Sequence, residues 1–153
     1  MKIIKANIED AQCILTIQKE AYLSEAVLND DFNIPPLTQT IEQLKAEFSH
    51  KTILKIIINN KIIGSGQAQL KGTTCYIGRM AIINEFKGQG LGSKLLSVLE
   101  TIYPEANCVE LFTGLKSKSN LEMYNRRGYK QVREKLMGKT TVVFLEKTLK
   151  HNN

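Results

Sequence analysis

The sequence has few of the features that mark secreted, membrane-spanning or metal-binding proteins. Its three cysteines, Cys13, Cys75 and Cys108, are odd in number and lack metal-site spacing, so we expect free thiols in a reducing cytoplasm and no metal ion. The longest apolar runs, such as residues 56–58, are far too short to cross a membrane. Polar residues at positions 7, 9 and 10 interrupt the stretch where a secretory signal would be apolar.

No linker, internal repeat or low-complexity segment divides the chain. A length of 153 residues is enough for one domain with its own core and too short for two ordinary ones. The hydrophobic fraction of 42% is normal for a globular protein. We therefore expect a single domain at residues 1–149, followed by a short tail at residues 150–153.

The chain is basic, with 21 Lys and Arg against 15 Asp and Glu and a net charge of +6. The basic residues are scattered, and no basic run is interleaved with aromatic residues, which argues against a nucleic-acid partner. Two explanations of the charge stay open, a solvated basic surface and a site for a small polyanionic ligand.

The hydrophobic pattern predicts a mixed sheet with helices on both faces. Thr40-Ile41-Glu42-Gln43 is a capping box that starts a helix, and Asn59-Asn60 is typical of a hairpin turn. Residues 28–37, which include Pro35-Pro36, are expected to form a loop. The expected order is β-α-α-β-β-β-α-β-α-β-β, with strands at 1–6, 52–58, 61–70, 74–82, 109–113, 129–134 and 141–147, and helices at 9–24, from 41, from 91 to Pro104, and at 119–127.

A glycine-rich segment, Lys87-Gly88-Gln89-Gly90-Leu91-Gly92, lies between an apolar run and a helical stripe. The first backbone N–H groups of a helix have no partner inside it, and they carry the positive end of the helix dipole. No Ser, Thr, Asp or Asn lies in this turn to cap them. The pattern therefore predicts that ligand phosphates bind at the helix start. The stripe consists of Leu91, Leu95, Leu99 and Ile102.

Three common phosphate-binding motifs do not fit this segment. G-x-G-x-x-G fails at Leu95 when counted from Gly90 and at Ser93 when counted from Gly88, which excludes the dinucleotide fingerprint and the kinase glycine loop. The P-loop string G-x-x-x-x-G-K-[ST] does not occur. What remains is a basic residue followed by x-x-Gly-x-Gly, a string that by itself also fits an ordinary tight turn.

The segment resembles the pyrophosphate-binding loop of the GCN5-related N-acetyltransferase (GNAT) family. The family usually has Arg or Gln at the position of Lys87, and lysine keeps the charge but loses the planar fork of arginine. The resemblance covers the order of elements over essentially the whole chain and is specific over residues 74–129. It implies the acyl-CoA N-acyltransferase fold, an α+β architecture of three layers around a mixed, mostly antiparallel sheet. The matching residues continue through Val109-Glu110-Leu111-Phe112-Thr113 to Ser117, Asn120, Tyr124 and Gly128-Tyr129.

The resemblance also implies acetyl-CoA as cosubstrate and a set of residues that bind it. Tyr124 would be the general acid that protonates the leaving thiolate, and a core tyrosine with a surface hydroxyl is the alternative. Asn120 could contact the pantetheine or simply begin a helix. The expected contacts with CoA are the backbone of Met80, Ala81 and Ile82 for the pantetheine and thioester, residues Lys87, Gly88, Gln89, Gly90, Leu91, Gly92 and Ser93 for the pyrophosphate, and Ser117 and Asn120 for the pantetheine.

The acceptor amine is expected over residues 22–37, where acidic side chains would attract a cation. The strand before the glycine turn has no carboxylate to act as a base. Glutamates elsewhere could serve, although a surface or structural charge is the preferred interpretation of each, and a water chain or an amine that arrives deprotonated would need no side-chain base. Arg79 could bind a substrate carboxylate, and a structural ion pair is the preferred alternative. The candidate acceptor-site residues are Tyr22, Glu25, Arg79 and Glu110, with Glu20, Asp30 and Asp31 as further carboxylates.

The sequence thus predicts a cytoplasmic N-acetyltransferase that moves an acetyl group from acetyl-CoA to a primary amine of a small molecule or a protein. One alternative is a non-catalytic acyl-CoA-binding regulatory module. Another is a nucleotide-binding protein with an unfamiliar glycine turn. Exposed edge strands near the C-terminus could pair two copies, which leaves a homodimer open.

Overall fold

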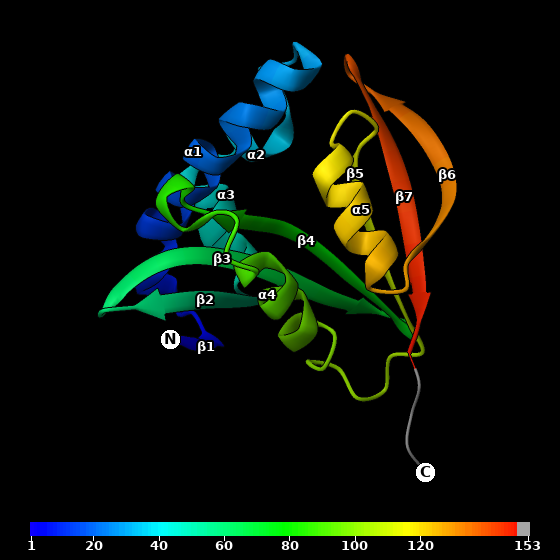
Figure 1. Cartoon of the computed structure of the whole chain (residues 1–153). Coiled ribbons are helices and arrows are strands. Elements are labelled where there is room, and N and C mark those ends of the chain that lie inside the picture. Colours follow the sequence, from blue (N-terminus) through cyan, green and yellow to red (C-terminus); the bar gives the residue numbers. More distant parts are fainter. Residues whose placement is uncertain (150–153) are drawn as a thin grey trace.

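The computed structural model describes residues 1–149, so the tail expected at residues 150–153 lies outside the described residues. Seven strands form one sheet in the order β1-β2-β3-β4-β5-β7-β6. All neighbours are antiparallel except β4 and β5, which are parallel. This is the mixed, mostly antiparallel sheet of the expected fold (Figure 1). The strands are β1 (Lys2–Lys5), β2 (Thr52–Ile58), β3 (Lys61–Lys71), β4 (Thr74–Ile82), β5 (Cys108–Gly114), β6 (Lys130–Met137) and β7 (Thr140–Thr148).

Helices cover both faces of the sheet, and none of those within residues 1–149 is long and apolar enough to cross a bilayer. The predicted capping box is confirmed, because Gln43 N donates to Thr40 Oγ1 at 3.2 Å and Thr40 N donates to Gln43 Oε1 at 2.9 Å. The helices are α1 (Ala11–Asn29), α2 (Pro35–Thr38), α3 (Ile41–Glu47), α4 (Leu91–Leu99) and α5 (Lys118–Arg126), with 3-10 turns η1 (Ile8–Asp10) and η2 (Asn84–Phe86).

Two predicted helix ends are wrong. Helix α1 continues to Asn29, where Asp30 adopts the left-handed conformation (φ 48°) and ends it, so with α2 starting at Pro35 the loop predicted at 28–37 is reduced to residues 30–34. The prolines at 35 and 36 begin α2, a position that suits a residue without an N–H group. Helix α4 ends at Leu99, well before Pro104, and Ile102 packs against the core from outside the helix.

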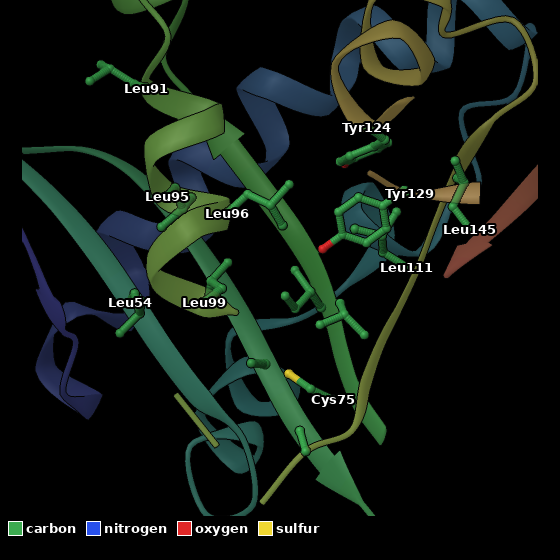
Figure 2. Close-up of a cluster of buried hydrophobic side chains, with 14 of the residues drawn as sticks. Leu54, Cys75, Leu91, Leu95, Leu96, Leu99, Leu111, Tyr124, Tyr129 and Leu145 are labelled. Atoms are coloured by element: carbon green, nitrogen blue, oxygen red, sulfur yellow. The ribbon is translucent and has the colours of Figure 1, made fainter. Parts of the chain in front are cut away.

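The core lies on both faces of the sheet. Leu95, Leu96 and Leu99 of α4 are fully buried against strands β2 to β5, as Figure 2 shows together with Tyr124 and Tyr129. On β2, Leu54 packs on this side, whereas its neighbour Ile53 packs against α1 and α3. Because successive side chains of a strand point to opposite faces of the sheet, β2 contributes to the core on both faces.

A β-bulge interrupts the pairing of β4 with β3. Ser65 pairs with Ala81 and Gln67 with Gly78, so one residue of β3 lies opposite two residues of β4, Arg79 and Met80. Arg79 adopts a left-handed conformation (φ 53°), which is rare outside glycine. The extra residue also exchanges the two faces of β4. The side chains that face α4 are Cys75 and Ile77 before the bulge and Met80 and Ile82 after it.

Strands β4 and β5 separate soon after they pair. Only Thr74, Cys75 and Tyr76 of β4 have partners on β5, and beyond them the two strands diverge (Figure 1). Within residues 1–149, the edge of β4 that faces β5 therefore has no strand partner from Ile77 to Ile82. The sheet is split at its centre, and unpaired backbone N–H and C=O groups line one side of the split.

Candidate active site

The split between β4 and β5 holds a cavity of about 370 Å³. Five parts of the chain line it, so the fold brings together segments that lie far apart in the sequence. The lining residues are Ala21, Tyr22, Ser24 and Glu25 of α1, residues 77–82 of β4, residues 86–88 and 90–92 of the glycine turn, Leu111, Phe112 and Thr113 of β5, and Ser119, Asn120, Met123 and Tyr124 of α5.

The glycine turn leads directly into α4 at one end of this cavity. Gly88 (φ 78°) and Gly90 (φ 76°) adopt left-handed conformations that other residues disfavour. Gly90 is the N-cap of α4, and no side chain caps the helix. A Cβ atom added at Gly88, Gly90 or Gly92 would have no atom of residues 1–149 within 4 Å beyond its chain neighbours and the backbone of its own helix. The turn therefore leaves open space in front of uncapped backbone N–H groups, which is the arrangement that binds phosphate well.

Helix α5 places Tyr124 against the cavity. The helix is fixed at both ends, because Asn120 Nδ2 donates to Thr113 Oγ1 at 3.2 Å and Gly128 follows in a left-handed conformation (φ 93°). The Tyr124 ring is buried edge-on against Tyr129, with 5.7 Å between centroids. Within residues 1–149 its hydroxyl has no hydrogen-bond partner, and burial raises the pKa of the phenol well above 10.

Two side chains of α1 face Tyr124. Glu25 accepts a hydrogen bond from Ser117 Oγ at the start of α5, which joins the two helices. Tyr22 lies three positions before Glu25 on the same helix, and burial raises the pKa of the Tyr22 phenol to about 12. The charge of Glu25 raises the pKa of both tyrosines further. A carboxylate and two protonated phenols thus meet at one wall of the cavity.

Most of the expected site residues line this cavity. Four of them do not line it. Glu110 forms an ion pair with Arg133 at 2.8 Å, Ser117 donates to the cavity residue Glu25, Ser93 Oγ accepts from Arg127 at 3.3 Å, and Gln89 is exposed. The expected residues that line it are Met80, Ala81, Ile82, Lys87, Gly88, Gly90, Leu91, Gly92, Asn120 and Tyr124, together with Tyr22, Glu25 and Arg79.

Three expectations about charged residues change. Within residues 1–149 Arg79 forms no ion pair, and its Nη1 donates to Gln39 Oε1 at 3.1 Å. Asp31 is buried and bound by Lys139 N and Thr140 Oγ1, so it cannot attract a cation to the cavity. Glu25 lies on helix α1, which continues beyond the end predicted at residue 24.

Sequence reasoning missed several lining residues. Gly78, inside a strand pattern, is a known signal for a bulge or a close backbone approach, and it lies beside Arg79. Phe112 and Thr113 carried no signal of their own, because their place in the site depends on where β5 leaves β4. The other missed residues are Ala21, Ser24, Ile77, Phe86, Leu111, Ser119 and Met123.

A sheet split at this position, with an uncapped glycine turn on one side and α5 on the other, defines an acyl-CoA N-acyltransferase fold. The chain belongs to the acetyltransferase (GNAT) family, whose model matches residues 14–129. It is therefore an N-acetyltransferase, as the glycine turn and Tyr124 led us to expect. No curated protein sequence matches the chain.

Solved structures share this fold at low sequence identity. The PaiA N-acetyltransferase of Thermoplasma acidophilum in complex with coenzyme A is 17% identical, with a TM-score of 0.78 over 97% of this chain and 98% of its own. The ribosomal-protein-S18-alanine N-acetyltransferase of Escherichia coli is 12% identical, with a TM-score of 0.80 over 99% and 96% of the two chains. An acetyltransferase of Thermus thermophilus is 13% identical, with a TM-score of 0.75 over 97% and 96%.

Proposed function

We propose that this protein transfers an acetyl group directly from acetyl-CoA to a primary amine, with Tyr124 as general acid. The observation that carries the proposal is the cavity in the split sheet, which brings the glycine turn, the unpaired edge of β4 and the Tyr124 phenol into one site. Coenzyme A is long, anionic at one end and thiol-bearing at the other. The glycine turn would match the anionic end, the unpaired edge of β4 the arm, and Tyr124 the thiol.

The glycine turn would bind the pyrophosphate. Its backbone N–H groups and the start of α4 supply donors and a positive dipole end, and Lys87 adds a positive charge. The free edge of β4 at Met80 to Ile82 would pair with the amides of the pantetheine arm, as a neighbouring strand would. Asn120 lines the same cavity from α5 and could contact the arm from the other side.

The proposed transfer requires that the amine, the thioester and the Tyr124 hydroxyl be held in position for reaction. The neutral amine nitrogen attacks the thioester carbonyl, a C–N bond forms, and the C–S bond breaks as its electron pair moves to sulfur. Tyr124 donates its proton to that sulfur, and the amine loses one proton to Glu25 or to water. Burial keeps the Tyr124 phenol protonated, so its proton is available when the thiolate forms. Holding the two reactants together supplies up to roughly 7–11 kcal/mol of the barrier reduction.

A thermal-shift comparison tests the cosubstrate. Acetyl-CoA at about one hundred times its Kd should stabilise the protein by about 2.7 kcal/mol, because a ligand that binds only the folded state adds its binding energy. ATP and NADH at the same concentrations serve as controls and should give no comparable shift. A shift with either nucleotide and none with acetyl-CoA would contradict the proposal.

Release of free thiol from acetyl-CoA in the presence of an amine library tests turnover. We expect thiol release that depends on the amine. Binding of acetyl-CoA without thiol release from any amine would favour the alternative, a regulatory module that binds acyl-CoA and does not turn it over. The lack of a carboxylate on the cavity-facing part of β4 is the feature that keeps this alternative worth testing.

A further inference from the structure

We propose that the acceptor is a small amino carboxylate, bound as a zwitterion with its amine toward Glu25 and its carboxylate on Arg79. This inference rests on the proposed function, because it names the substrate class of the same site. It starts from a second cavity of about 250 Å³ that adjoins the first at the split. The residues that line both cavities are Tyr22, Ile77, Gly78, Arg79 and Phe112.

Arg79 is held in place by the bulge and by a buried polar network. Its guanidinium donates to Gln39 Oε1, and Gln39 is fixed in turn by Gln18 Nε2 at 2.9 Å and by the carboxylate of Glu47. Glu47 is itself neutralised by Lys51. Arg79 therefore keeps its charge without an ion pair among residues 1–149, and it has further N–H donors beyond the one that Gln39 uses.

The backbone of Arg79 supports a binding role. A non-glycine residue with φ 53° is strained, and such strain concentrates where it positions a side chain for function. A fixed, unpaired guanidinium that lines two adjoining cavities matches the planar fork of a carboxylate. Arg79 is therefore the group that selects a carboxylate on the acceptor.

Two opposite charges share one cavity with a phenol. Tyr22, Glu25 and Arg79 all line the first cavity, and the pKa of Tyr22, which burial raises most, is lowered by the charge of Arg79 and raised by that of Glu25. An ammonium group beside Glu25 and a carboxylate on Arg79 would thus both lie near Tyr22. The amine would also lie in the cavity that contains Tyr124.

The second cavity suits a compact molecule with apolar and polar parts. Its apolar lining includes Ile77, Tyr76 and Phe112, and its polar lining includes Lys51, Gln67 and Gln69 beside Arg79. Lys51, although paired with Glu47, adds a second positive charge that also favours a carboxylate. The amine of a protein's lysine side chain or of its N-terminus is not attached to a molecule with its own free carboxylate a few bonds away, so it could not occupy Glu25 and Arg79 together in this way. A polyamine would bring a second positive charge toward Arg79, which Coulomb repulsion disfavours.

The first experiment compares matched acceptors in the thiol-release assay. The twenty standard amino acids, β-alanine and 4-aminobutyrate are screened, and the best of them is compared with its own amide and with the amine that lacks the carboxyl group. We expect a kcat/KM about tenfold or more higher for the free acid, the order that one charge-assisted hydrogen bond supplies. Equal or better turnover of the amide or the simple amine would overturn the inference.

The second experiment changes Arg79. Arg79→Gln should raise KM for the free acid by about tenfold or more and leave KM for its amide unchanged, whereas Arg79→Lys should restore part of the preference. Arg126→Gln, at the exposed end of α5, removes the same charge outside both cavities and should change neither KM. Affinity for acetyl-CoA should be unchanged in all three variants.

The two proposals fail in different ways. Loss of the acetyl-CoA thermal shift in the unmodified protein would contradict the proposed function. A normal acetyl-CoA shift, together with no binding or acetylation of any amino carboxylate, would overturn only the acceptor class. Acetylation of peptides or polyamines at rates equal to those for the best free acid would also overturn only the acceptor class.

Discussion

At the residue scale, burial keeps the Tyr124 phenol protonated, which the proposed acid role requires. Its ring packs into the core beside Tyr129, and its hydroxyl reaches the cavity, where no other group in residues 1–149 uses its proton. Because burial disfavours the phenolate, Tyr124 stays protonated across the neutral pH range. The phenol can therefore give up its proton only to a strong base that forms beside it during the reaction.

Replacement of Tyr124 by phenylalanine tests this role. Tyr124→Phe removes only the hydroxyl, so we expect kcat to fall about a hundredfold or more while the Kd for acetyl-CoA changes little. The fold should tolerate the change, because no protein hydrogen bond is lost. Steady-state kinetics with a fixed amine and titration of acetyl-CoA measure the two quantities.

Tyr103→Phe is the matched control for this substitution. The Tyr103 hydroxyl donates to Ala68 O at 3.2 Å, and neither residue lines the cavity that contains Tyr124. Loss of this hydroxyl should therefore affect stability and leave kcat unchanged. A Tyr124→Phe enzyme with the kcat of the unmodified protein would remove the general-acid role.

At the scale of elements, the glycine turn contains glycines of two kinds. Gly88 and Gly90 need their positive φ, so any side chain there strains the backbone whatever binds. Gly92 lies in the first turn of α4 with a helical backbone and open space around it. The protein itself therefore gives no reason for glycine at position 92, whereas a phosphate that approaches the backbone closely would.

Gly92→Ala separates these two reasons. Alanine in a helix is more favourable than glycine by about 0.5–1 kcal/mol, so the variant should melt at a higher temperature. Its added methyl group enters open space at a residue that lines the cavity, where we expect the pyrophosphate, so affinity for acetyl-CoA should fall about tenfold. Thermal melting and ligand titration of the same sample check both signs. A variant that is more stable and binds acetyl-CoA as well as before would contradict the phosphate site.

The elements that sequence alone predicted well are those with local causes. The capping box at Thr40, the hairpin around Asn59-Asn60 and the strand at 74–82 depend on neighbouring residues and were confirmed. The end of α1 was missed because Val27 and Leu28 continue the helix with exposed side chains, which breaks the amphipathic pattern.

The site was predictable only in part, for a related reason. The glycine turn and Tyr124 carry local motifs, and both line the cavity. The pairing of Glu110 with Arg133 and the contact of Arg79 with Gln39 join residues 23 and 40 positions apart, and no spacing rule reveals such tertiary contacts. Sequence could therefore indicate the glycine turn and Tyr124 as parts of the cavity wall, but not where the charged residues lie.

At the scale of the whole molecule, several contacts join the two halves of the split sheet. Strands β4 and β5 share three residue pairs, Arg127 and Lys147 bind Glu100 at the end of α4, and Ser117 binds Glu25. A further connection joins the end of α1 to the turn between β6 and β7 (Figure 1). There Asp31 accepts hydrogen bonds from Lys139 N at 3.0 Å and from Thr140 Oγ1 at 2.9 Å. This buried carboxylate links segments more than one hundred positions apart and helps to fix the width of the cavity between them.

Asp31→Asn should weaken this connection in a way that depends on pH. The hydrogen bond from Thr140, followed by those from Lys139 N and Asn33 N, holds the pKa of Asp31 below its ordinary value of 3.8. A carboxylate with a lowered pKa stabilises the fold fully above its unfolded value, and this contribution disappears as pH falls through the folded value. The variant should therefore melt a few degrees below the unmodified protein at pH 7 and pH 5, and the difference should shrink below pH 3.8.

Asp30→Asn is the control, because Asp30 is exposed and asparagine tolerates its left-handed backbone. The melting temperature of this variant should match that of the unmodified protein at each pH. A difference for Asp31→Asn that stays constant from pH 7 to pH 3 would show that the charge of the carboxylate does not hold the two halves together.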